Sequence, residues 1–160
     1  MIVAMVPFSF NSDFIDERWV FVLEERDKQS NALKVVDFSK TKFVSGFHEE
    51  DKEYAPGAGE VKLARLRETG RILYGATVFE GLWQNYLEKK KTSVLEILFR
   101  EQNVAFMTFF GDIFLDPVSQ KRCVLALCRY DRNGGEWRKD IYWLDFTWSN
   151  KHLTIASNSA

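Results

Sequence analysis

The chain has 160 residues, 46% hydrophobic and 28% charged, which is the composition of one folded domain rather than a disordered segment. Its 22 basic and 23 acidic residues leave a formal net charge of −1. Nucleic-acid binding draws on a basic excess, so this balance argues against it. No apolar stretch reaches the length of a membrane span, and the apolar start, residues 1–8, has no basic leader. We therefore expect no membrane association and a cytoplasmic location.

The first third of the chain, residues 1–55, indicates several short strands. The predicted strands are runs rich in Val, Phe and Leu, at 19–23, 33–38 and 43–47. The charged stretch 24–31 suits a hairpin connection between the first two. Residues 48–60 show no hydrophobic period and contain Pro56-Gly57, so this stretch predicts a surface loop.

The middle part, residues 56–91, is predicted to hold the rest of this loop and then the main helix. Apolar side chains recur there at helical spacing and form one stripe: Val78, Phe79, Leu82, Trp83, Tyr86 and Leu87. Thr77 and Glu80 have the spacing of a capping box, which predicts that the regular helix begins there. Residues 61–69 fit neither a helical nor a strand period.

The last part, residues 92–160, predicts an antiparallel meander. Its expected strands are 94–99, 104–110 with a continuation to 115, 123–130, 137–148 and 153–156. Asn133-Gly134 is a strong hairpin signal because both residues tolerate positive φ. Cys123 and Cys128 fall on opposite faces of one strand, so we expect two buried thiols rather than a disulfide.

The meander strands are apolar on both faces, so both faces must be covered. We predict an α+β fold, antiparallel and β-rich with about eight or nine strands, in which one main amphipathic helix packs on the C-terminal meander sheet. The whole chain, 1–160, forms one domain. The N-terminal strands or a second copy of the chain could cover the face that the helix leaves open.

Candidate binding residues lie on and around the last long strand. Trp143 is a large ring with polar groups on its own side, among them Lys139 and Asp145, which is typical of ligand or interface residues. Trp137 and Arg138 belong to a second group, in which basic side chains and rings alternate around the Asn133-Gly134 hairpin. Its other members are Arg129, Tyr130, Arg132 and Lys139. Such a group can hold an anionic ligand or single-stranded nucleic acid.

Metal and acid–base candidates are weaker. His48, Glu49 and Asp51 place an imidazole beside carboxylates, but they lack the spacing of known metal motifs, and a solvated acidic loop is the simpler interpretation. We therefore predict no metal and no cofactor. Asp112, Asp140 and Asp145 are the carboxylates that could serve acid–base chemistry in a pocket.

These features favour a non-enzymatic binding or assembly protein, which contacts a protein partner or its own copy through an aromatic-rich sheet surface. The alternative is a small-ligand-binding or enzymatic domain with a pocket between the helix and the sheet. No sequence motif chooses between them.

Overall fold

The computed structural model describes residues 2–5 and 15–158. Half of the apolar start used in the leader argument, residues 1 and 6–8, therefore lies outside the described residues. The fold is α+β with mostly antiparallel strands, as predicted. In the described part of the chain, no helix is long and apolar enough to cross a membrane.

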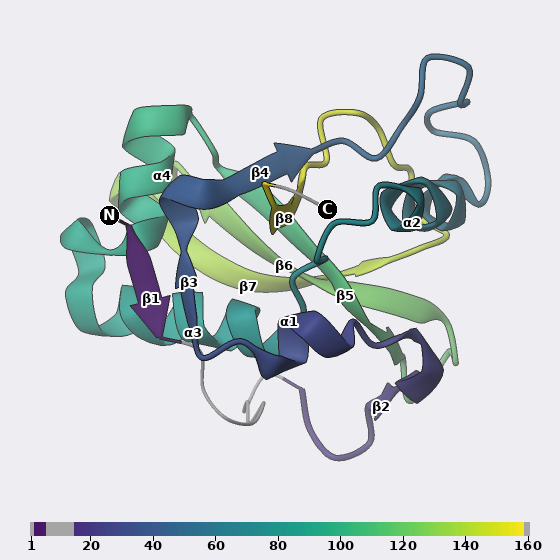
Figure 1. The fold of residues 1–160 in the computed structure, drawn as a ribbon, viewed down its shortest axis with the longest axis horizontal. Coiled ribbons are helices and arrows are strands. Elements are labelled where there is room, and N and C mark those ends of the chain that lie inside the picture. The colour runs from purple at the N-terminus through teal and green to yellow at the C-terminus, as the bar shows by residue number, and fades with distance from the viewer. Residues whose placement is uncertain (1, 6–14, 159–160) are drawn as a thin grey trace.

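The chain order mixes short strands with helices before the long strands begin (Figure 1). The strands are β1 (Val3–Met5), β2 (Val20–Phe21), β3 (Val35–Asp37), β4 (Thr41–Val44), β5 (Phe106–Leu115), β6 (Arg122–Tyr130), β7 (Glu136–Trp143) and β8 (Thr154–Ser157). The α-helices are α1 (Lys28–Ala32), α2 (Ala58–Glu68), α3 (Ala76–Lys89) and α4 (Val94–Gln102). Short 3-10 turns are η1 (Leu23–Glu25), η2 (Phe38–Lys40), η3 (Lys90–Thr92) and η4 (Arg132–Gly134).

The main sheet has the strand order β4-β8-β5-β6-β7, and β2 pairs with the far end of β5. The hairpins β5–β6 and β6–β7 confirm the predicted meander. The last strand departs from it, because β8 lies between β4 and β5, antiparallel to the first and parallel to the second. The chain therefore crosses back over the sheet after β7.

Two predicted strand assignments are wrong. Residues 94–99 belong to helix α4, whose first turn is capped by the Ser93 hydroxyl accepting from the Glu96 amide at 3.3 Å. Val94, Leu95 and Leu98 are its buried positions, which is a helical spacing. Strand β7 ends at Trp143, well before residue 148, and a turn follows in which the Phe146 amide donates to the Trp143 carbonyl at 3.1 Å.

The connection at 24–31 is also not a simple hairpin, since it contains η1 and α1 and leads from β2, which pairs with β5, to β3, which pairs with β1. Asp27 caps α1, accepting at Oδ1 from the Ser30 amide at 2.9 Å. Residues 58–68, which include much of the stretch without a clear period, form α2. One of its buried positions is Lys62, and this charged residue interrupts the apolar period by which the helix could be recognised in the sequence.

An irregularity in β5 positions the start of α3. A step of five positions along β5, from Phe109 to Phe114, matches a step of only two along β6, from Leu125 to Cys123, so the alternation of faces changes there. The distortion turns the buried Asp112 carboxylate toward α3, where Oδ2 accepts from the Ala76 amide at 2.7 Å. The predicted capping box is therefore wrong. The N-cap is Gly75, and a carboxylate from β5 takes the cap's role.

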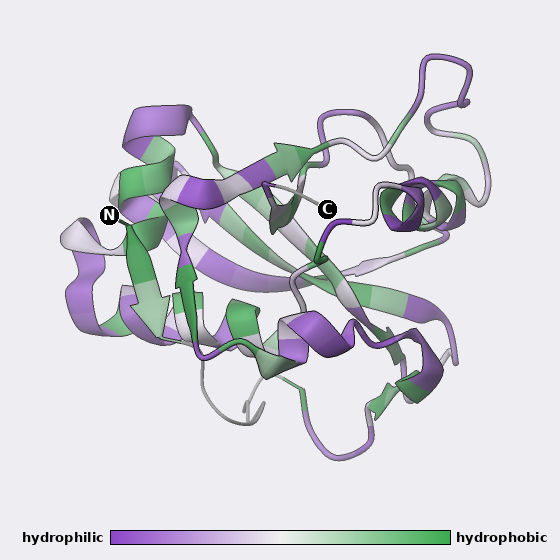
Figure 2. Ribbon diagram, in the orientation of Figure 1, coloured by the Kyte–Doolittle hydropathy of each residue, from purple (hydrophilic) through white to green (hydrophobic). Residues whose placement is uncertain are grey.

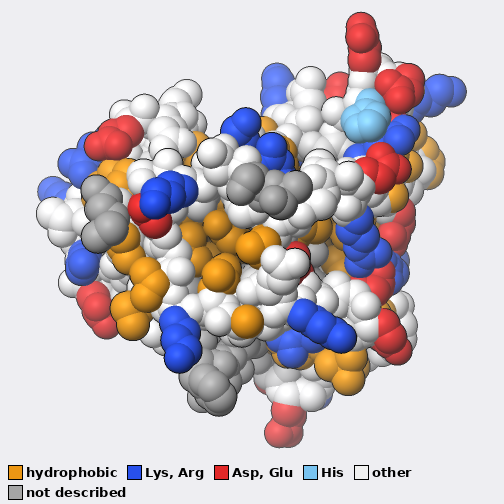
Figure 3. All heavy atoms as spheres, viewed as in Figure 1, with side chains coloured by type: hydrophobic (Ala, Val, Ile, Leu, Met, Phe, Trp, Pro, Cys, Tyr) orange, Lys and Arg blue, Asp and Glu red, His pale blue; other side chains and the backbone are white. Residues whose placement is uncertain are grey.

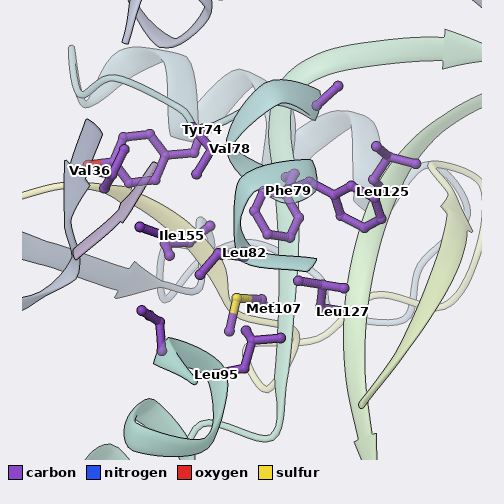
Figure 4. Packing of buried hydrophobic residues seen from close by; sticks show 14 of the residues in the cluster. Val36, Tyr74, Val78, Phe79, Leu82, Leu95, Met107, Leu125, Leu127 and Ile155 are labelled. Carbon is purple, nitrogen blue, oxygen red and sulfur yellow. The ribbon is translucent and has the colours of Figure 1, made fainter. Parts of the chain in front are cut away.

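One face of the sheet carries the larger core. Phe79 and Leu82 of α3 and Leu95 of α4 pack on Met107, Leu125 and Leu127 of the sheet (Figure 4). The rings of Phe79 and Phe109 meet edge to face, with centroids 5.4 Å apart. The β1–β3 pair joins this same core through Ala4 and Val36. Figure 2 shows β1 and β3 as mostly hydrophobic and α1 as mostly hydrophilic.

The opposite face is covered by α2 and by residues 144–153, which connect β7 to β8. Leu63 and Leu66 of α2 pack with Phe110 of β5 and with Leu144 and Trp148 of the connection. A β-carbon on Gly59 would lie 2.3 Å from the Leu144 carbonyl oxygen, so α2 approaches this segment closely. The chain therefore covers both sheet faces itself. The N-terminal third contributes Val22, Val44 and Phe47 to this second core, and α2 and residues 144–153 supply the rest of its cover.

Candidate functional site

A cleft of about 400 Å³ lies between the α3–α4 corner and the β6–β7 hairpin. We call it the basic cleft. It is lined by Tyr86, Lys90, Lys91, Glu96, Arg100, Arg129, Gly134, Gly135 and Glu136. It lies at the end of α3 and beside the hairpin rather than between the helix and the face of the sheet, where the sequence suggested a pocket. Its size suits a single small ligand.

Arg129 of β6 lies in the cleft with its guanidinium held in place. Its side chain is only 12% exposed. Nε donates to Glu96 Oε1 at 3.1 Å and Nη1 donates to Asp131 Oδ1 at 2.7 Å. The guanidinium carbon lies 3.9 Å from the centroid of the Phe99 ring. No described residue accepts from Nη2, so one donor group of a rigid cation remains available.

The hairpin is shaped to admit this guanidinium. Gly135 has a φ of +79°, and a β-carbon there would lie 2.3 Å from Arg129 Nη2. Any larger residue would displace the arginine. The turn predicted from Asn133-Gly134 therefore also makes room for the cation, through the following Gly135.

Exposed cations surround Arg129. Lys90, Lys91 and Arg100 line the cleft, and in the described residues none of the three has a carboxylate partner. The Lys90 ammonium lies 5.2 Å from the centroid of the Tyr86 ring. Against these four cations stand Glu96 and Glu136, which leaves a local charge of +2. The charge-balanced chain thus has a positive patch that its net charge conceals.

Glu96 organises the wall of the cleft behind Arg129. Its Oε1 accepts from Arg129 Nε and from the indole nitrogen of Trp137, the latter at 2.9 Å. The Tyr86 hydroxyl accepts from the Trp137 backbone amide at 3.4 Å. These bonds join α3, α4, β6 and β7 around the cleft, so its shape is fixed by the fold.

The structure separates the candidate residues of the hairpin group. Trp137 is 2% exposed and belongs to the core, although its indole nitrogen supports the cleft through Glu96. Arg138 points to the opposite sheet face, where its guanidinium lies 5.4 Å from the Tyr130 ring centroid. The Lys139 ammonium lies 5.3 Å from the Trp83 ring centroid. Only Arg129 of this predicted basic group lines the cleft.

Trp143 and Asp145 do not form a common face, because β7 ends at Trp143. The Trp143 indole nitrogen donates to Asp116 Oδ2 at 3.1 Å, and its ring centroid lies 4.8 Å from that of Phe146. Asp145 is exposed and pairs with Lys121 at 2.6 Å. Whether these residues bind a partner stays a prediction.

The loop with His48, Glu49 and Asp51 is engaged in its own contacts. Asp51 accepts the Arg65 guanidinium and, at 2.7 Å, the His48 backbone amide. The Arg65 bond is the main cause that holds the pKa of Asp51 below its ordinary value. Within residues 2–5 and 15–158, no group of three or more His, Cys, Asp or Glu side chains is arranged to hold a metal ion. Figure 3 shows acidic and basic side chains interspersed in this region and over α2.

The three acid–base candidates lie apart. Asp112 is fully buried and pairs with Arg26 Nε at 2.7 Å. Asp140 accepts from the amide of its neighbour Ile141 at 2.8 Å. Neither of them, nor Asp145, lines the basic cleft. Both cysteines are free and buried, as predicted.

Sequence reasoning missed the partners of Arg129. By sequence alone, Lys90 and Lys91 are cations suited to a helix end, and Arg100 directly follows the predicted strand 94–99, which is in fact part of α4. The Ser93–Glu96 cap is the local signal for α4, and a helix starting there would have placed these cations at one corner with the end of α3. Their approach to β6 is a long-range contact that local pattern does not reveal.

Comparison with protein-family models, with curated proteins and with solved structures finds no match to this chain.

Proposed function

We propose that this protein is a non-enzymatic binding protein whose basic cleft takes a small molecule carrying an anionic group, a phosphate or a carboxylate. The observation that carries the proposal is Arg129, a nearly buried guanidinium fixed by Glu96, Asp131 and Phe99, with Nη2 left without an acceptor among the described residues. A preorganised arginine binds an oxyanion at low entropic cost.

The surrounding charges support the same ligand chemistry. Lys90, Lys91 and Arg100 are exposed around the cleft and can reach an anion that Arg129 holds. The negative charge of Glu96 repels a bound anion only in part, because Glu96 Oε1 already accepts hydrogen bonds from Arg129 and Trp137. Tyr86 adds a ring on which the rest of the ligand can lie.

Association through the sheet surface, the other hypothesis from the sequence, has less support in the geometry. Its premise was that a sheet face needs cover, and α2 and residues 144–153 supply that cover. Strand β7 is an edge of the sheet, yet two of its backbone amides already donate to side chains of the same molecule. These are Trp137 to the Tyr86 hydroxyl and Ile141 to Asp140 Oδ1. Such bonds reduce the capacity of an edge to add a strand.

Isothermal titration calorimetry with inorganic pyrophosphate and with citrate tests the proposal and separates the two anion types. We expect saturable binding of at least one of them, weaker at higher salt. Replacing both Lys90 and Lys91 by Gln should weaken binding roughly tenfold without changing stability, since the two side chains are exposed.

The control is Lys121→Gln, which removes an exposed lysine outside the cleft. It should bind like the wild type. The proposal fails if neither anion binds saturably at low salt, or if the Lys121 variant weakens binding as much as the pair in the cleft.

A further inference from the structure

Lys62 of α2 is a fully buried lysine in an aromatic enclosure. Its relative exposure is 0%. The ammonium lies 5.6 Å from the ring centroids of Phe47 and Phe110 and 5.9 Å from that of Trp148. It donates to the Ser45 carbonyl and, at 2.7 Å, to the His152 carbonyl. This one side chain thus joins α2 to the chain after β4 and to the segment before β8.

No described carboxylate forms an ion pair with Lys62. On α2 itself the neighbouring charged side chains, Glu60 and Arg65, are engaged elsewhere, with Arg122 and Asp51. Toward the sheet and the 144–153 segment, the titratable groups near the enclosure are His152 and Tyr142. Burial raises the pKa of Tyr142 to about 12, so it stays neutral. A charged lysine here has carbonyl and ring partners but no counter-ion.

His152 is a second base in the same layer. Its ring lies among Phe106, Tyr142 and Trp148, with centroids 5.5, 6.0 and 5.5 Å away. Its Nδ1 accepts from the Ser149 amide at 3.0 Å, which folds the end of the 144–153 segment back on itself. Protonation would remove that acceptor and place two positive charges beside the Trp148 ring, which both side chains approach.

We propose that Lys62 and His152 form a proton-sensitive latch, which holds α2 and residues 144–153 over the aromatic face of the sheet and loosens as protons are added. Opening would expose Phe110 and Trp148, which are buried, and would further uncover Phe106 and Tyr142, which are half-buried. The aromatic sheet surface indicated by the sequence would then be a conditional surface, covered in the closed form.

The direction follows from the two bases. Burial lowers the pKa of the Lys62 amine from 10.5 to about 7, and burial followed by the Lys62 charge lowers the pKa of His152 below 6.5. A base with a lowered pKa in the closed form takes up protons on opening, so the closed form is favoured at high pH. The stability that neutral Lys62 gives to the closed form is lost as the pH falls from 10.5 toward 7. The stability that neutral His152 gives to it is lost below pH 6.5.

Hydrogen–deuterium exchange, corrected for the intrinsic pH dependence of exchange, tests the latch in peptides covering 45–54 and 144–153. From about pH 8.5 to about pH 6.5, Lys62 alone should raise the opening constant roughly twentyfold. Lys62→Met should abolish this rise. Lys151→Met, an exposed lysine in the same segment, should retain it.

His152→Gln provides an independent arm should the Lys62 variant not fold. It should keep the rise above about pH 6.5 and lose the further rise that the wild type shows below it. The latch is overturned if the pH dependence is unchanged in Lys62→Met, or in His152→Gln below pH 6.5. It is also overturned if β6 peptides exchange in step with the two segments, because the opening would then be global.

Discussion

Replacing Asp112 by Ala should be among the most damaging single changes to this fold. The Asp112 side chain is 1% exposed and pairs with Arg26, itself 27% exposed. The same carboxylate caps α3 through the Ala76 amide at 2.7 Å. Removing it leaves a largely buried guanidinium without its ion-pair partner, at a cost of about 3–5 kcal/mol, and a helix N-terminus without its cap, at about 1 kcal/mol.

Because one carboxylate serves both roles, the two costs do not add fully, and we expect a loss of about 4 kcal/mol in the free energy of unfolding. Urea denaturation followed by circular dichroism measures it. Asp112→Asn keeps an acceptor for the Ala76 amide and should lose less. The matched control is Asp140→Ala, since that carboxylate accepts from the amide of its neighbour Ile141 and should cost below about 1 kcal/mol. Equal losses in Asp112→Ala and Asp140→Ala would refute the structural role of Asp112.

Three further expectations concern the core. The unfolding free energy of the wild type should rise by about 1.5 kcal/mol from pH 7 to about pH 8.5, because Lys62 has a folded pKa of about 7. Urea titrations at the two pH values measure this rise, and Lys62→Met should not show it. Gly111→Ala should lower the melting temperature by roughly 10 °C, since its β-carbon would lie 2.0 Å from the Leu73 carbonyl oxygen. Gly134→Ala should lower the melting temperature less, because the space around Gly134 is open. Burial raises the pKa of the Cys123 and Cys128 thiols to about 12, so a thiol reagent near pH 8 should label the native protein at least about a hundredfold more slowly than the denatured chain. Rapid labelling of the native protein would contradict that burial.

The sequence predicted those parts of the fold that local pattern encodes. The stripe from Val78 to Leu87 gave α3, and the hairpin signal at Asn133-Gly134 joined β6 to β7. Helix α4 was missed because Val, Ile and Phe also favour strands. Its Ser93–Glu96 cap was the signal that could have decided the matter.

Other features depend on contacts between distant segments. The place of β8 beside β5 rests on Thr108 and Thr154, whose hydroxyls lie 2.9 Å apart, and no local pattern announces that pairing. The irregularity in β5 reverses which residues face the larger core, so strict alternation fails beyond Phe109. Lys62 occupies a core position that a sequence reading assigns to solvent.

The candidate site was partly predictable for the same reason. The sequence placed Arg129 and Trp137 at one hairpin, and the structure shows the first lining the cleft and the second supporting its wall. The cations that join them, Lys90, Lys91 and Arg100, come from the α3–α4 corner, and only tertiary packing brings that corner to the hairpin.

The central claim is that Arg129 binds an anion in the basic cleft. A nuclear magnetic resonance titration with inorganic pyrophosphate, observing the Arg129 Nε–H resonance together with the backbone amides of Lys91, Gly134 and Gly135, tests it directly. The account predicts saturable shifts at these positions with one common dissociation constant. Shifts that do not saturate, or saturable shifts that leave the Arg129 resonance unmoved, would contradict it.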